Sequence, residues 1–110
     1  MAECVHLTRF EAPRAQPATP RASGCEECLA MGSSWVHLRL CLTCGHVGCC
    51  DSSPHRHATA HFQALQHPVI KSYEPGESWA WCYVDEVSTD TIAAFPIETP
   101  PHHYAAPTYL

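Results

Sequence analysis

Two pairs of cysteines have the spacing of metal-binding knuckles. Cys25 and Cys28 form one C-x-x-C pair, and Cys41 and Cys44 form another. This spacing allows both sulfurs of a pair to reach one tetrahedral zinc ion at about 2.3 Å. A C-x-x-C pair can instead be a redox centre, but that role requires a βαβ context and a nucleophilic cysteine at a helix start, which this sequence does not show. The pairs therefore predict metal binding.

Histidines supply the second type of ligand. His57 and His61 are four residues apart in a segment expected to be helical, so their rings should project from one face, and His67 follows shortly after. Spacing alone leaves open whether His57 and His61 share one ion, and whether the two cysteine pairs form a Cys₄ site. Five further histidines have no expected role: His37, His46, His55, His102 and His103.

A third group of ligands joins two distant segments. Cys4 and His6 occur near the start of the chain, whereas Cys82 and Asp85 occur far beyond the helix. A zinc ion shared by these four residues would cross-link the start of the domain to its end. A carboxylate oxygen is a harder ligand than a thiolate, so this site should hold zinc less tightly. The inventory fits about three Zn²⁺ ions and leaves no open coordination position. We therefore expect a protein that is not an enzyme.

The composition indicates why metal would be needed. The chain has 110 residues, eight of them cysteines, and few large apolar side chains, so burial alone should barely offset conformational entropy. The N-terminus has neither a basic n-region nor an apolar h-region, which favours a reducing cytoplasm and zinc over disulfides. The expected core consists of Val36, Leu38, Leu40, Phe62, Leu65, Val69, Ile70, Trp79 and Val84.

Charge and hydropathy exclude two classes of partner. The formal net charge is -5, and the six basic residues are scattered without forming a stripe that could neutralise phosphates. No nucleic acid partner is therefore expected. No apolar run approaches the length of about 18 residues that a membrane span requires, so we expect a soluble monomer without membrane contact.

The elements that must position these ligands are short. Residues 35–40 partly alternate and predict a strand, and Pro54 to Gln66 predict the one main helix, with Ser53 as its N-cap. Residues 69–73 and 79–84 predict a hairpin around a Pro-Gly turn. The expected fold class is α+β: a small zinc-stabilised domain with a short twisted antiparallel sheet and one main helix.

The sequence resembles a known family. The run LCLTCGHVGC at 40–49, the pair His57-x-x-x-His61 and the run SWAWCY at 78–83 look like a UBP-type zinc finger, the ubiquitin-binding finger of ubiquitin-specific proteases and of a cytoplasmic histone deacetylase. The resemblance extends from Cys4 to Glu86. We expect a zinc-finger domain over residues 1–87. Prolines without an apolar period predict that 8–23 form a surface loop, and the same pattern predicts a proline-containing tail at 88–110 that either drapes on the domain or remains mobile.

The resemblance also implies how the ligands are shared among three zinc sites. The first site would consist of Cys25, Cys28, Cys49 and His57, with Cys49 preferred over its neighbour Cys50. The second site would consist of Cys41, Cys44, His61 and His67. The third site would consist of Cys4, His6, Cys82 and Asp85.

A binding function follows from the same resemblance. In ubiquitin-binding members, aromatic residues matching Trp81 and Tyr83 line a cleft for a free C-terminal Gly-Gly tail, and we expect Trp35 to join them. The implied function is a non-enzymatic peptide- or protein-binding module that reads a polypeptide C-terminus. Alternating aromatics on a strand could equally serve packing alone.

One departure from the family argues against binding of a C-terminal tail. Family members that bind the tail usually carry Gly-Arg after the cysteine that matches Cys49, whereas this chain has Cys50-Asp51. An aspartate would repel a terminal carboxylate, unless Arg39 or Arg56 takes over the role of the arginine. The alternative is a purely structural zinc domain without a ubiquitin-type ligand.

Overall fold

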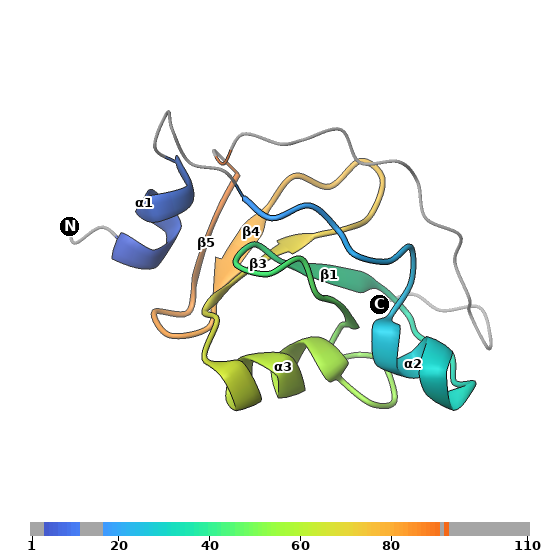
Figure 1. Cartoon of the computed structure of the whole chain (residues 1–110). Coiled ribbons are helices and arrows are strands. Elements are labelled where there is room, and N and C mark those ends of the chain that lie inside the picture. Colours follow the sequence, from blue (N-terminus) through green and yellow to red (C-terminus); the bar gives the residue numbers. More distant parts are fainter. Residues whose placement is uncertain (1–3, 12–16, 91, 93–110) are drawn as a thin grey trace.

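The structure is a computed structural model that describes residues 4–11, 17–90 and 92. Within these residues, the chain forms three helices and a five-stranded antiparallel sheet with the strand order β2-β1-β3-β4-β5 (Figure 1). The predicted α+β class is confirmed, with α3 as the main helix. The elements are α1 (Val5–Glu11), α2 (Glu26–Met31), β1 (Leu38–Cys41), β2 (Val47–Cys49), α3 (His57–Leu65), β3 (Val69–Ser72), β4 (Ala80–Cys82) and β5 (Val87–Thr89).

The sheet forms around the predicted hairpin. Strands β3 and β4 pair with Ile70 opposite Trp81, and Gly76 in the turn has a φ of 80°, which a glycine adopts without steric cost. Strand β1 pairs with β3 on one side and β2 on the other. It begins at Leu38 rather than at the predicted residue 35, because the Leu38 amide donates to the buried carboxylate of Glu74.

Helix α3 is shorter than predicted. It begins at His57, three residues after Pro54, and Arg56 precedes it in the left-handed conformation without a side-chain cap. Ser53, the predicted N-cap, accepts a hydrogen bond from the Val36 amide instead. The helix ends at Leu65, where Gln66 takes the left-handed conformation. In Figure 1, α3 lies along the sheet beside β1 and β2.

Two boundaries of the predicted domain differ from the structure. Residues 8–11 belong to helix α1 rather than to a surface loop, because Leu7, which is only 4% exposed, docks the helix on the core. Of the remaining predicted loop, 12–16 lie outside the described residues and 17–23 are irregular. Residues 88–89 belong to β5 rather than to a tail, and Ile92 is buried. Residues 93–110 lie outside the described part.

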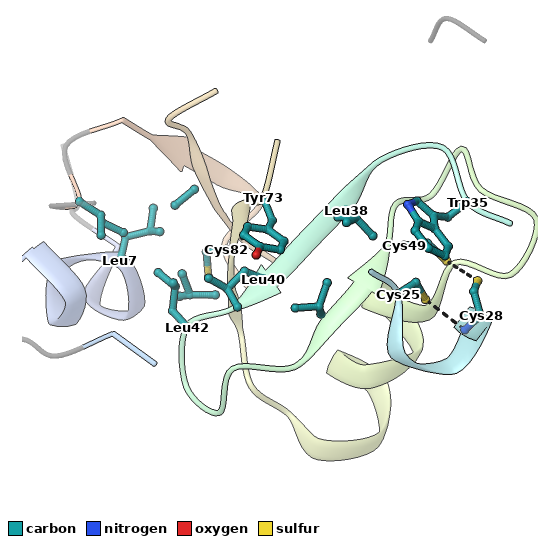
Figure 2. Packing of buried hydrophobic residues seen from close by; sticks show 14 residues of the cluster. Leu7, Cys25, Cys28, Trp35, Leu38, Leu40, Leu42, Cys49, Tyr73 and Cys82 are labelled. Atoms are coloured by element: carbon teal, nitrogen blue, oxygen red, sulfur yellow. Dashed lines mark hydrogen bonds between the residues drawn. The ribbon is translucent and has the colours of Figure 1, made fainter. Parts of the chain in front are cut away.

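The core is elongated rather than spherical. Leu65 and Val84, which were predicted to be buried, are each 54% exposed. Cysteines that belong to potential metal sites take up much of the interior instead. Figure 2 shows the cluster extending from Leu7 and Leu42 at one end, past Leu40, Tyr73 and Leu38, to Trp35 with Cys25, Cys28 and Cys49 at the other. No helix among the described residues has the length and apolar character needed to cross a membrane.

Candidate functional site

The four residues of the first site converge from three elements. Cys25 is the N-cap of α2, Cys28 lies in its first turn, Cys49 ends β2 and His57 begins α3. The Nδ1 atom of His57 lies 3.3, 3.4 and 3.5 Å from the sulfurs of Cys25, Cys28 and Cys49. A tetrahedron with metal–ligand bonds of about 2.0 to 2.3 Å has edges of about 3.5 Å. The donor set therefore fits one tetrahedral zinc ion.

The second site lies between β1 and α3. Cys41 ends β1 and Cys44 follows in the turn, while His61 lies on α3 and His67 follows that helix. The sulfur of Cys41 is 3.5 Å from Nδ1 of His67, and the sulfur of Cys44 is 3.3 Å from Nε2 of His61. All four ligand atoms lie within 4.8 Å of one another, which also fits a tetrahedral ion.

The third site joins α1 to the end of β4. Nδ1 of His6 lies 3.1 Å from Oδ2 of Asp85, 3.5 Å from the sulfur of Cys82 and 3.9 Å from that of Cys4. The side chains of His6 and Asp85 are 32% and 41% exposed, so this site is open to solvent on one side. The structure thus brings together all twelve predicted ligands in the three expected groups.

These groups settle two points that spacing left open. His57 and His61 belong to different groups although they share a helix, and each cysteine pair has histidine partners rather than the other pair. Cys49 belongs to the first site, whereas the sulfur of Cys50 points to the hydroxyl of Ser53 at 3.5 Å.

The thiols of the first site cannot all ionise without a cation. Burial raises the pKa of Cys28 to about 11, while hydrogen bonding to Cys49 and burial raise that of Cys25 still further. The hydrogen bond from Cys25 lowers the pKa of Cys49 to about 5. Burial and the hydrogen bonds within the cluster thus oppose ionisation of Cys25 and Cys28 and favour that of Cys49. A bound dication would remove this restriction by stabilising every thiolate.

At the second site, burial lowers the pKa of His61 to about 4, so that its imidazole stays neutral and able to ligate.

An aromatic cleft of about 290 Å³ lies on the face of the sheet that α3 covers in part. Because side chains alternate along strands, Arg39 of β1, Ile70 of β3 and Trp81 of β4 point to this face. Tyr83 stacks on Phe62 of α3, with a centroid distance of 4.7 Å. The cleft is lined by Arg39, Cys50, Asp51, Ser52, Ile70, Trp79, Trp81 and Tyr83, hereafter the aromatic cleft.

The predicted membership of the cleft was partly wrong. Trp35 is 2% exposed and packs in the core near Cys25 and Cys28, so it does not line the cleft. Trp79 takes that place, and its position two residues before Trp81 was the sequence signal that could have identified it. Of the two arginines considered, Arg39 lines the cleft and Arg56 does not.

Arg39 is held in a fixed position. Its guanidinium lies over the Trp79 ring at 4.5 Å, and Nη1 donates to the Leu38 carbonyl at 3.0 Å. A weaker contact of 4.0 Å reaches Glu77. Within the described residues, these contacts leave Nε and Nη2 available. A planar, oriented guanidinium of this kind suits recognition of a carboxylate.

Comparisons with known proteins agree with this geometry. The sequence profile of the family described as the Zn-finger in ubiquitin-hydrolases and other proteins matches residues 25–93. A protein from Rhodopseudomonas palustris, whose structure was determined by NMR in solution, is 51% identical; the match covers 94% of this chain and 99% of that protein, with a TM-score of 0.79. No curated protein matches the chain. Cys4 and His6 of the third site lie outside the segment that the family profile covers.

Proposed function

The chain belongs to the family of zinc fingers found in ubiquitin hydrolases and other proteins, and on this premise we propose that it is a non-enzymatic module that binds the C-terminus of a polypeptide in its aromatic cleft. The observation that carries the proposal is the Arg39 guanidinium, oriented over Trp79 on the wall of the cleft. In this proposal, Arg39 binds the terminal carboxylate and the rings of Trp81 and Tyr83 hold the last residues of the tail.

Zinc would have a structural role in this module. The three groups of ligands would hold about three Zn²⁺ ions, which would supply the cross-links that a small core lacks. The second site includes Cys41 of β1, two residues after Arg39, and the third includes Cys82 of β4, between Trp81 and Tyr83. Metal binding would therefore fix the two strands that carry the cleft. Eight free cysteines suit the reducing cytoplasm in which we place the protein as a monomer.

A purely structural domain is the second candidate, and Asp51 favours it. This carboxylate lines the same cleft and would repel a terminal carboxylate that approached it closely. Arg39 overcomes this objection only if the tail binds with its carboxylate at Arg39, away from Asp51. The two candidates therefore differ in whether any free C-terminus binds.

Titration with two matched peptides tests the proposal. An eight-residue peptide that ends in Gly-Gly, supplied as the free acid and as the C-terminal amide, is added to the zinc-loaded chain while NMR shifts and calorimetric heats are recorded. We expect binding of the acid, with shifts at Trp81 and Tyr83, and much weaker binding of the amide.

Two variants locate the carboxylate. Arg39→Met should weaken binding of the acid about 10- to 100-fold, which is the usual loss for a hydrogen bond to a charged group. Arg9→Met, on the exposed side of α1, is the matched control and should bind as the parent does. Equal affinity for acid and amide, or no binding of either, would reject the C-terminus reader and favour the structural domain.

A further inference from the structure

A buried lysine lies on the face of the sheet opposite the aromatic cleft. Lys71 follows Ile70 of β3, which lines the cleft, so the Lys71 side chain points to the other face, where Leu40 and Ala80 are its cross-strand partners. Lys71 is 1% exposed, and both partners are fully buried. Within the described residues, Lys71 takes part in no ion pair, and Nζ donates to the Ser78 carbonyl at 2.7 Å. The ammonium is thus buried with one carbonyl oxygen as its partner.

Stability alone does not account for a lysine at this position. Lysines usually keep the ammonium in water while the stem lies on apolar surface, whereas burial removes that hydration and lowers the pKa of Lys71. A buried charge is costly, and an apolar side chain of similar volume is often equally or more stabilising. The contact that the ammonium makes therefore explains its presence better than the stability of the core does.

That contact holds the turn between β3 and β4. Residues 75–78 of the turn are exposed, and Gly76 within it has a positive φ. Ser78 directly precedes Trp79, so the Ser78 carbonyl and the Trp79 Cα belong to one planar peptide unit. A hydrogen bond to this carbonyl restricts the plane from which the Trp79 side chain departs.

Ser72 holds the same turn at two further points. Its amide donates to the Trp79 carbonyl at 3.0 Å, and its hydroxyl donates to the carboxylate of Glu77. Arg39 lies opposite Ser72 on β1, 4.0 Å from Glu77 and with its guanidinium over the Trp79 ring. Trp79 is therefore fixed on both sides of its Cα, by Lys71 at the preceding carbonyl and by Ser72 at its own.

We propose that Lys71 is a positioning residue for the aromatic cleft: through the Ser78 carbonyl it sets the orientation of the Trp79 ring, and thereby that of the Arg39 guanidinium stacked on this ring. The buried charge then serves the geometry of the cleft rather than the stability of the fold. The consequence for a ligand rests on the proposed function, whereas the orientation of Trp79 and Arg39 is measurable without any ligand.

Lys71→Met tests this role, because methionine fills a similar volume without a donor or a charge. In the full zinc-loaded chain, the unfolding midpoint in denaturant should equal or exceed that of the parent. The NMR shifts of the Arg39 side-chain protons, which the Trp79 ring current displaces, should move toward those of an arginine that contacts no ring. The free-acid peptide ending in Gly-Gly should bind about 3- to 10-fold less tightly, the equivalent of one lost hydrogen bond.

Two further variants separate positioning from stability. Val69→Ala is the matched control, because Val69 is buried on the same strand and the same face but lies away from the turn. It should lower the unfolding midpoint and keep the Arg39 shifts and the peptide affinity of the parent. Lys71→Gln retains an N–H donor on a slightly shorter side chain and should keep part of the Arg39 shift, and it replaces Lys71→Met if that variant does not fold. Zinc content is measured for every variant.

The outcomes distinguish this role from the proposed function. Unchanged Arg39 shifts in folded Lys71→Met overturn the positioning role, as do changes of the same size in Val69→Ala, which would reflect a general loosening of the core. If the Arg39 shifts change as expected but the parent binds neither the free acid nor the amide, Lys71 positions the pair of Trp79 and Arg39 and the C-terminus reader fails.

Discussion

The ring of His46 lies parallel to the ring of His61, with 4.0 Å between centroids and 2° between planes. His46 is 3% exposed, and its Nε2 is 2.7 Å from the carboxylate of Glu27 in α2. Glu27 in turn lies 3.9 Å from the sulfur of Cys25. His46 therefore connects a ligand of the first site to a ligand of the second, although spacing in the sequence gave it no role.

Truncation of His46 should loosen the second site. His46→Ala removes the surface on which His61 stacks and leaves the Glu27 carboxylate without its buried partner, so we expect a loss of about 2 to 4 kcal/mol in the free energy of unfolding. His46→Phe retains a stacking ring and should lose less. Denaturant unfolding measures this loss, and the rate of zinc release to a colorimetric chelator measures the loosening of the second site. Equal release rates for His46→Ala and the parent would contradict the connection.

Removal of zinc should unfold the protein. Because the core is small and rich in ligand cysteines, the chain stripped of metal under reductant should lose its NMR dispersion and recover it when zinc is added back. Native mass spectrometry of the purified chain should find about three zinc ions. A dispersed spectrum that survives complete metal removal would contradict the role of metal as the main cross-link.

The third site should lose its zinc first. Its ligands include an oxygen donor and two partly exposed side chains, His6 and Asp85, so chelators and water reach it more easily. Asp85→Ala should lower the zinc content by one and expose α1 to proteolysis, whereas Asp85→Cys should retain or strengthen binding. Asp90→Ala is the control for the loss of a surface carboxylate. Unchanged metal content in Asp85→Ala would reject Asp85 as a ligand.

Two glycines with similar positive φ angles should respond differently to alanine. Gly45 and Gly76 have φ values of 86° and 80°, so each substitution should cost about 1 kcal/mol from backbone strain. A Cβ on Gly45 would also lie 2.3 Å from the carbonyl oxygen of Thr19, whereas a Cβ on Gly76 meets no atom within 4 Å. Gly45→Ala should therefore cost at least about 3 kcal/mol and weaken the second site, as followed by denaturant unfolding. Similar midpoints for both variants would contradict this.

Two tryptophans should separate stability from binding. Trp35 is 2% exposed, so Trp35→Ala should lower the free energy of unfolding by about 3 to 5 kcal/mol through the cavity that it leaves. Trp81 lines the cleft, so Trp81→Ala should remain folded but lose affinity for the free-acid peptide. Denaturant melts and calorimetry distinguish the two effects. A Trp35→Phe variant that stays folded yet loses peptide binding would contradict this separation and indicate that Trp35 takes part in binding the peptide.

Ligand chemistry was largely predictable from the sequence, whereas the surroundings of the ligands were not. The cysteine pairs, the histidines of α3 and Asp85 were recognised by residue type and spacing, and the family resemblance supplied the grouping that the structure shows. Spacing could not predict that Glu27 and His46 support these sites: both lie within the cysteine-containing runs, but at positions that no ligand spacing singles out. Nor could it place Trp35, which precedes β1 and is buried by contacts with segments that are distant in the sequence.

The sequence by itself determined the kind of fold, because thiolates and imidazoles at short, fixed spacings have few ways to surround a tetrahedral ion, and the hairpin around Gly76 follows from local turn chemistry. Only the tertiary structure decided what the cleft contains. Arg39, Asp51 and Trp79 come from separate segments, and they meet because strand pairing and the packing of α3 bring those segments to one face of the sheet. Such contacts between distant residues depend on the register and twist of the whole sheet, which no local pattern encodes.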